Sequence, residues 1–237
     1  MKKTKWLAAC IAACALALVA GCSSGDDDEP DLPGIVETDD IEYDATKWVI
    51  EGTTVVRYTG AEADVRIPDG VTIIGESAFK GCQSLKSVTI PASVKSIGNS
   101  AFFQCMSLAS VEIPGSVKSI GEWAFSQCTS LASVTIPASV TSIGDLAFYQ
   151  CTSLASVTIP DSVNSIGGCA FSQCTSLASV AIPGSVTSIG NSAFEECTSL
   201  KEVKYDGTKE QWEKIDIGSG VFPYGVKIYD KEGKEIK

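Results

Sequence analysis

Six cysteines recur at a step of 23 residues and are the first candidates for chemistry in this chain. They are Cys82, Cys105, Cys128, Cys151, Cys174 and Cys197. A cysteine can bind zinc, act as a nucleophile, form a disulfide or pack as a small apolar residue. Zinc needs four convergent ligands, whereas a constant step predicts a column of thiols. Histidine is absent from the 237 residues, which removes the usual base for a cysteine nucleophile.

The ladder cysteines also hold an apolar position within their repeat. In one copy Ala101, Cys105 and Leu108 stand at i, i+4 and i+7, with Phe102 beside Ala101. This spacing predicts the apolar face of a short helical turn. We therefore expect buried free thiols, with disulfides between neighbouring coils or cysteine chemistry as the alternatives. Cys169 lies outside the ladder.

The elements that position these residues follow the same period. Leucine, proline, phenylalanine and glycine each recur at the 23-residue step in six copies, which span residues 62–199. A fixed period of 20–50 residues is typical of a solenoid or a propeller. One copy alone buries too few apolar side chains to offset its loss of backbone entropy, so the copies must stack.

Each copy has a pattern of short elements. Val88 and Ile90 alternate with Thr89, which predicts a short strand with one inward and one outward side. A proline follows and ends the strand, because it lacks a backbone donor. Gly98 then suits a corner with positive φ. Together with the helical turn described above, these elements predict an α+β repeat solenoid with short strands and short helical turns in each 23-residue repeat.

The repeat pattern LxSVxIPxSVxSIGxxAFxxCxS resembles the BspA-like leucine-rich repeat, found on surface proteins of bacteria and some protists. The segment 203–220 resembles the terminal unit of such proteins, through Tyr205, Gln211 and Trp212. The resemblance implies a leucine-rich-repeat-like coil, and adhesion to or binding of host proteins such as matrix components. Because a solenoid needs capped ends, we expect residues 41–61 to form an N-terminal β cap and residues 200–237 to form a C-terminal cap. We expect Trp212 to cover the core, with a ligand-stacking role as the alternative.

The N-terminus has the pattern of a targeting segment. Residues 1–21 combine three lysines with a short apolar run, which predicts a secretory signal peptide. The sequence LVAGC, ending at Cys22, resembles the bacterial lipobox, which implies cleavage before Cys22 and lipid attachment to its sulfur. Acyl chains on this cysteine would anchor the chain to a membrane.

Residues 22–40 are acidic and contain glycine, proline and serine, which predicts a disordered tether. The acidic run after Cys22 also resembles the signal that exports lipoproteins of Bacteroides-type bacteria, whereas a plain solvated linker is the alternative. We expect an exported chain, lipid-anchored to the outer membrane and facing the cell exterior.

The most informative positions are those where the copies differ. Two nearby repeat positions carry large apolar side chains on neighbouring coils, and each position forms a column along the stack. Phe103 and Tyr149 follow the repeat phenylalanine, and Trp123 and Leu146 precede the AF pair. These four residues could form an exposed apolar patch of the kind that binds a partner, and partial burial between coils is the alternative. A second candidate surface, for which an ordinary strand surface without a binding role is the alternative, is made by the outward strand positions Arg66, Thr89, Glu112, Thr135, Thr158 and Ala181.

Charge and composition narrow the function classes. The net charge of −11 argues against nucleic acid as a partner. No paired carboxylates or nucleophile–base spacing stand outside the repeat pattern, so we expect no enzyme activity, no cofactor and no metal site. The sequence predicts a lipid-anchored surface binding or adhesion protein with an extracellular protein partner, from the host matrix or a cell surface. A glycan-binding lipoprotein and a structural surface-layer component are the alternatives.

Overall fold

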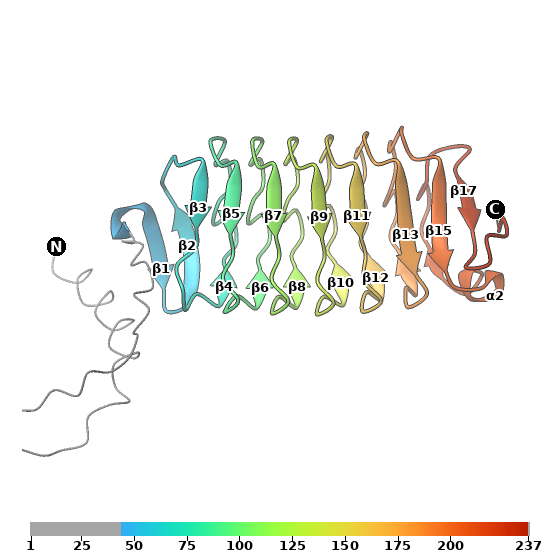
Figure 1. Ribbon diagram of the computed structural model, residues 1–237, viewed down its shortest axis with the longest axis horizontal. Helices are drawn as coiled ribbons and strands as arrows, with labels where there is room; N and C mark the ends of the chain where they lie inside the picture. Colours follow the sequence, from blue (N-terminus) through green and yellow to red (C-terminus); the bar gives the residue numbers. More distant parts are fainter. Residues whose placement is uncertain (1–43, 237) are drawn as a thin grey trace, which may run out of the picture. The chain divides into compact units, whose positions relative to one another are not determined.

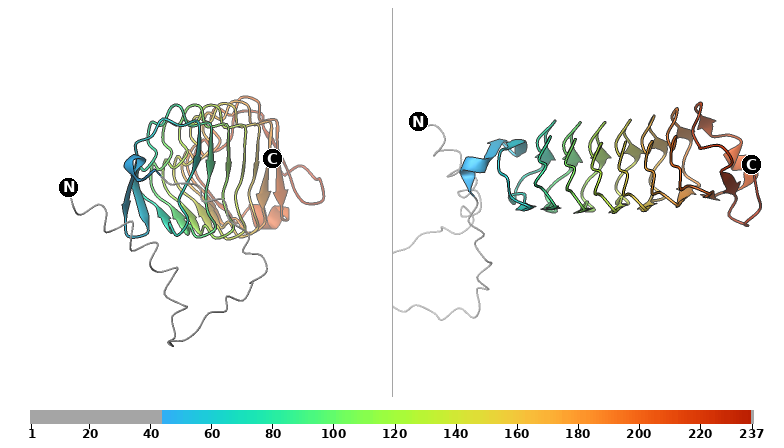
Figure 2. Two further views of the ribbon diagram at one scale, coloured as in Figure 1. Left: turned by 60° about the vertical axis from the view of Figure 1, so that its left-hand side comes forward. Right: turned by 90° about the horizontal axis from the view of Figure 1, so that it is seen from above.

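The computed structural model describes residues 44–236. The expected signal peptide, the tether and Cys22 lie outside the described residues. From Lys47 onward the chain winds into a stack of coils (Figure 1). Each coil contributes one strand to each of two sheets, which face each other across the core (Figure 2).

The first sheet has eight parallel strands, one after another along the stack. Its members are β3 (Asp64–Arg66), β5 (Ser87–Thr89), β7 (Ser110–Glu112), β9 (Ser133–Thr135), β11 (Ser156–Thr158), β13 (Ser179–Pro183), β15 (Glu202–Asp206) and β17 (Lys227–Tyr229). Register is kept from coil to coil, so that Val88 pairs with Val111 and Val111 with Val134. We call the outward side of this sheet the strand face.

The second sheet has nine strands, most of them only two residues long. They are β1 (Trp48–Glu51), β2 (Thr54–Tyr58), β4 (Ile73–Ile74), β6 (Ser96–Ile97), β8 (Ser119–Ile120), β10 (Ser142–Ile143), β12 (Ser165–Ile166), β14 (Ser188–Ile189) and β16 (Asp216–Ile217). Only the hairpin of β1 and β2 is antiparallel among the described strand pairs. This hairpin lies at the end of the sheet, ahead of the first repeat.

The strands form where the sequence alternates, as predicted. Val88 and Ile90 are buried in the core, and Thr89 between them is exposed. In the next coil the N–H of Val117 bonds to the carbonyl of Pro114 at 3.0 Å, which closes a turn directly after the strand. The repeat proline therefore lies at or just after the end of each strand from β3 to β13, and it begins the link to the second sheet.

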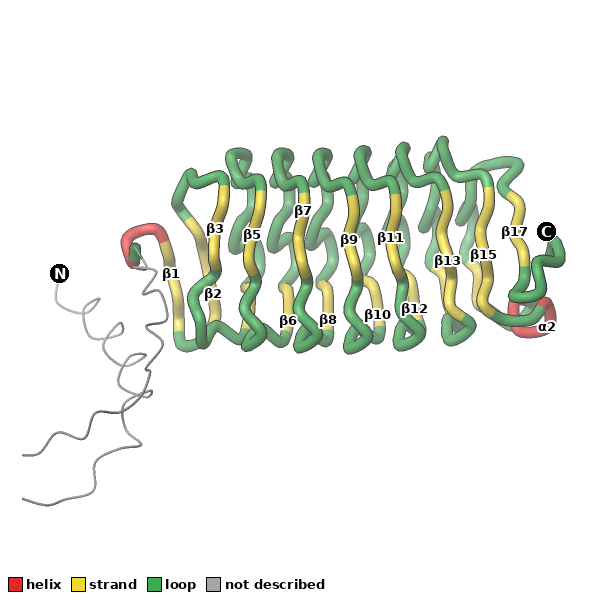
Figure 3. The backbone as a smooth tube through the Cα atoms, in the orientation of Figure 1, coloured by secondary structure: helices red, strands yellow, loops and turns green. Residues whose placement is uncertain are grey.

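The predicted helical turns are wrong. The only helices among the described residues are η1 (Ala45–Lys47) and α2 (Lys209–Trp212), one near each end of the described chain (Figure 3). In the segment from Gly98 to Leu108, Ser100 and Gln104 have positive φ, which an α-helix cannot contain. The N–H of Phe102 bonds to Ala124 of the next coil at 2.7 Å, rather than within its own coil. The fold is thus a β-solenoid and not an α+β solenoid.

The recurring glycines serve a purpose other than the one predicted. Gly98 does not have positive φ. A Cβ atom placed there would come within 2.9 Å of the backbone of Ile74 and Gly75 in the preceding coil. This glycine is needed because the coils approach each other closely, and positive φ occurs two residues later, at Ser100.

A column of stacked phenylalanine rings fills the centre of the core. Phe79, Phe102, Phe125, Phe148, Phe171, Phe194 and Phe222 follow one another with ring centroids 4.9–5.4 Å apart. The first six are fully buried. This stack couples each coil to its two neighbours, so the stability of the solenoid is shared along its length.

Both ends of the stack are covered. At the first end Tyr58 packs between Trp48 and Phe79, with ring centroids 4.7 Å and 5.3 Å away. At the far end Trp212 is buried and packs against Tyr205 and Phe222, which confirms its predicted place as a cap on the core. Trp212 is held by helix α2, whose first turn is fixed by a capping box of Thr208 and Gln211.

Candidate functional site

The segments that connect the second sheet back to the first carry the residues that vary most between coils. One such segment runs over residues 121–132, between β8 and β9. We call the outward side of these segments the turn face. Phe103, Trp123, Leu146 and Tyr149 all lie in such segments, and all four are half-buried. We call these four residues the apolar patch.

Three rings of the apolar patch contact one another. Phe103 and Trp123 meet edge to face with centroids 6.0 Å apart and planes at 84°. Trp123 and Tyr149 meet in the same way at 6.2 Å and 74°. Leu146 follows Trp123 in its column, on the next coil. The structure therefore brings together residues from three coils, although none of them is fully exposed.

The backbone of the turn face is hydrogen-bonded to the next coil at two positions of the apolar patch. Trp123 and Leu146 have φ of 58° and 54°, an uncommon value for bulky residues. The N–H of Trp123 bonds to the carbonyl of Asp145 at 3.0 Å, and that of Leu146 to the carbonyl of Gly168 at 2.8 Å. Hydrogen bonds between coils thus fix the backbone at both positions.

A ladder of glutamine side chains borders the apolar patch. The amide of Gln104 donates to Gln127, Gln127 to Gln150, and Gln150 to Gln173, at 2.8, 2.9 and 2.6 Å. At the first coil the Lys80 ammonium lies over the ring of Phe103, 5.4 Å from its centroid. The patch is therefore an apolar strip with polar groups along one edge and a cation at one end.

Small residues between the aromatic ones allow the rings to meet. Ser126 occupies the column of Phe103 and Tyr149, on the coil between them, and is fully buried. Its hydroxyl has no hydrogen-bond partner within the described residues. Ring orientation and the burial of Ser126 are features that sequence reasoning missed, since the column pattern specifies neither.

The ladder cysteines are structural. All seven described cysteines are free, and the five from Cys105 to Cys197 in the ladder are buried. The thiol of Cys128 donates to the carbonyl of Phe102 in the preceding coil at 3.2 Å, and the other four make the equivalent bond. Burial raises the pKa of Cys128 to about 12, so this thiol is not a nucleophile near neutral pH.

The buried thiols predict a loss of stability in alkali. Burial raises the pKa of Cys128 and of Cys197 to about 12 in the folded chain, whereas an unfolded thiol titrates near its ordinary value. Below that ordinary value the thiol is protonated in both states, so the full stabilisation is present. As the pH rises toward 12, the unfolded chain loses the proton first and the free energy of unfolding falls. We expect a lower urea midpoint at about pH 10 than at about pH 7.

The matched control for this prediction is Cys128→Ala combined with Cys197→Ala. Removing two titrating thiols should reduce the difference between the two urea midpoints. A difference of unchanged size would contradict the assignment of the alkaline loss to these thiols.

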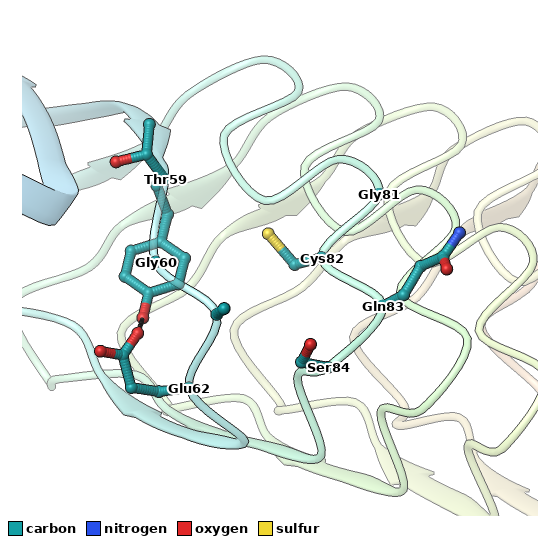
Figure 4. Close-up of a pocket in the computed structure, with 9 residues that line it drawn as sticks. Thr59, Gly60, Glu62, Gly81, Cys82, Gln83 and Ser84 are labelled. Carbon is teal, nitrogen blue, oxygen red and sulfur yellow. Dashed lines mark hydrogen bonds between the residues drawn. The ribbon is translucent and has the colours of Figure 1, made fainter.

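Cys82 is the exception in the ladder, because it is only half-buried and no phenylalanine carbonyl precedes it. It lines a hollow of about 330 Å³ beside the N-terminal hairpin, with Gly60, Glu62 and Gly81 (Figure 4). Glu62 accepts hydrogen bonds from Tyr58 and from Lys47. These bonds, led by that from Lys47, lower the pKa of Glu62 to about 2. Since both carboxylate oxygens are engaged, we assign this hollow to the cap.

The second candidate surface, the strand face, repeats in register from coil to coil. Thr89, Glu112 and Thr135 pair in register along the stack, and so do Thr158 and Ala181. Beyond Ala181 the face is hollowed by about 570 Å³, where Lys204 and Tyr229 form part of the lining. The surface carries small polar side chains without a contiguous apolar group.

Comparison with known protein families shows to which family this chain belongs. The description "BspA type Leucine rich repeat region" matches in six copies, over residues 57–157 and 128–224. The chain belongs to the BspA-type leucine-rich repeat family. This confirms the resemblance of the repeat pattern. A comparison with curated proteins found no match.

Two solved structures of leucine-rich repeat proteins are similar to about 70% of this chain. The leucine-rich repeat protein of T. pallidum has 35% identity and a TM-score of 0.65, over 73% of this chain and 84% of that one. A leucine-rich cell surface protein of Faecalibacterium prausnitzii A2-165 has 34% identity and a TM-score of 0.57. That match covers 67% of this chain and 52% of the other, so this chain spans about half of that protein.

Within residues 44–236, this BspA-type chain shows neither a metal-binding cluster nor a membrane-spanning helix. No group of three or more histidine, cysteine or acidic side chains there could hold a metal ion. The same part of the chain has no helix with the length and apolarity needed to cross a membrane.

Proposed function

We propose that this chain is a lipid-anchored scaffold on the cell surface, which binds a protein partner through the apolar patch on the turn face. Proteins of the BspA-type family are generally non-enzymatic scaffolds, and one similar structure is named as a cell surface protein. The anchor would be Cys22, at the end of the lipobox-like sequence. Adhesion to a host matrix or cell-surface protein is the role we assign to the complex.

The observation that carries the proposal is the contact of Phe103, Trp123 and Tyr149 across three coils. Aromatic residues that are packed on one side and open on the other are the usual hot spots of protein interfaces. The backbone beneath them is fixed by hydrogen bonds between coils, so little ordering entropy is lost when a partner binds.

Glycan binding is the second candidate, because aromatic rings beside an amide ladder could stack on sugars and hydrogen-bond to their hydroxyls. The ring planes argue for protein instead. Successive rings are turned by 84° and 74°, so they do not form one flat platform for a chain of sugars. A protein surface can fill the angles between such rings.

The test is a parallel screen of the full-length chain, purified in detergent, against matrix proteins and glycans. We expect binding to a protein and none to glycans. Binding to glycans alone would replace the proposed partner class, and binding to neither would leave the structural surface-layer role as the better account.

The anchor is tested separately with Cys22→Ala. We expect the wild-type chain to fractionate with membranes and to carry acyl groups on Cys22 by mass spectrometry. The variant should lose both, because a chain without acyl groups lacks that membrane affinity. Unchanged membrane fractionation of the variant would contradict anchoring at this residue.

A further inference from the structure

Charge is unevenly distributed along the repeats. Residues 119–200 contain no lysine, arginine or histidine. Their acidic residues are Glu122, Asp145, Asp161, Glu195 and Glu196. The basic residues of the repeats all precede this stretch, at Arg66, Lys80, Lys86, Lys95 and Lys118. The later coils, which include Trp123, Leu146 and Tyr149, therefore present negative charge without any compensating cation of their own.

Four of these five acidic residues lie on the turn face, two of them beside the apolar patch and two of them on the coil that is two places beyond Tyr149. Glu122 and Asp145 directly precede Trp123 and Leu146 in the chain, and both are exposed. Glu195 occupies the column of Tyr149, and Glu196 continues the column of the glutamine ladder, both of them exposed. Asp161 is the exception, because it lies in the proline turn between β11 and β12.

The carboxylates of the turn face lack a basic partner within the described residues, although Asp145 Oδ1 accepts a hydrogen bond from the N–H of Gly168 at 2.7 Å. No salt bridge among the described residues involves Glu122, Asp145 or Glu195. Burial raises the pKa of the Cys169 thiol, and the negative charges of Glu195 and Asp145 raise it further. Cys169 holds the same repeat position as Trp123. The patch thus has carboxylates without a basic partner beside Trp123 and Leu146, whereas Lys80 lies over Phe103 at its other end.

We infer that the segment which docks on this surface is a basic polypeptide segment rich in arginine. This rests on the proposed function and specifies the partner. Guanidinium groups can stack on Trp123 and Tyr149 and pair with the exposed carboxylate of Glu122 at the same time. Nucleic acids and membrane surfaces are anionic and glycans are neutral or anionic, so the carboxylates of the turn face attract none of them.

The test uses synthetic peptides of one length and fixed composition, immobilised as an array. One set carries arginine, a second carries lysine at the same positions, and a third carries glutamate. The full-length chain is applied at about 50 mM and about 300 mM NaCl, which weakens exposed ion pairs. We expect arginine peptides to bind about threefold or more tightly than lysine peptides, through ring stacking. Glutamate peptides should not bind, and the higher salt should lower the arginine affinity about tenfold.

Two charge variants locate the site. Glu122→Gln with Glu195→Gln removes two charges from the turn face, and we expect about a fivefold loss of affinity for the arginine peptides. Glu112→Gln with Asp161→Asn removes two exposed charges from the strand face and the proline turn. Since net charge changes equally in both, this control should lose less than twofold.

Several results would overturn the inference. They are equal binding of all three peptide sets, no binding of any set, and equal losses in the two charge variants. The proposed function can still stand in those cases, provided that a protein from the screen loses affinity when Trp123 and Tyr149 are replaced. If replacing Trp123 and Tyr149 leaves the affinity for that protein unchanged while the charge variants behave as expected, the apolar patch is not the binding site. The inference about the acidic residues would then stand without the proposed function.

Discussion

Replacing Phe102 by alanine should lower the free energy of unfolding by about 3–5 kcal/mol, the largest effect on stability that we expect from one side chain. Phe102 is fully buried and stacks between Phe79 and Phe125, at 4.9 Å and 5.1 Å. Its loss leaves a cavity in the middle of the ring column and removes contacts with both neighbouring coils. Urea unfolding followed by circular dichroism measures the change.

The adjacent residue supplies the matched control. Phe103 has the same side chain in the same coil, but it is half-buried on the turn face. Phe103→Ala should cost about 1 kcal/mol or less, because that ring is not enclosed. Similar losses for the two variants would contradict the assignment of Phe102 to the core and Phe103 to the surface.

Replacing Trp123 or Tyr149 by serine should lower the affinity for the protein partner at least about tenfold, since central aromatic side chains dominate binding energy. Serine is the natural replacement at these positions. Ser100 and Ser192 hold the column of Trp123 with the same positive φ, and Ser126 and Ser172 hold the column of Tyr149. The variants should therefore keep the fold and lose only the rings.

The control for binding is Thr135→Ala with Thr158→Ala on the strand face, which should leave the affinity unchanged. Binding is measured by surface plasmon resonance with the partner found in the screen, and folding by the urea midpoint. A loss caused by the threonine variants and not by the serine variants would move the site to the strand face.

The periodic part of the fold could be predicted from the sequence because the same residue type recurs at each 23-residue step. Equivalent positions must therefore stack on one another in the core. Val88, Ile90 and Cys105 are buried where their apolar positions require it. The helical turn was mispredicted because Ala101, Cys105 and Leu108 have helical spacing, and spacing alone does not reveal hydrogen bonds. Alternate N–H groups in this segment bond to the next coil, with positive φ at Ser100 and Gln104. Contacts between coils thus override the local pattern.

For the candidate site, the sequence predicted only which residues lie on neighbouring coils. The columns placed Phe103, Trp123, Leu146 and Tyr149 on neighbouring coils, and the structure has them there. Ring angles depend on side-chain torsions and on the small residue Ser126 between the rings, and a single sequence specifies neither. The absence of basic residues from 119–200 was visible in the sequence. Its consequence for binding depends on which acidic and aromatic side chains lie together on the turn face, and only the structure shows that.

The central claim is that the partner docks on the turn face, and site-specific photo-crosslinking tests it most directly. A benzoylphenylalanine residue is introduced in place of Tyr149 in one full-length chain and in place of Thr135 in another. Both chains are irradiated with the partner from the screen. Our account predicts a crosslinked product from position 149 and none from position 135. A product from position 135 alone would contradict it.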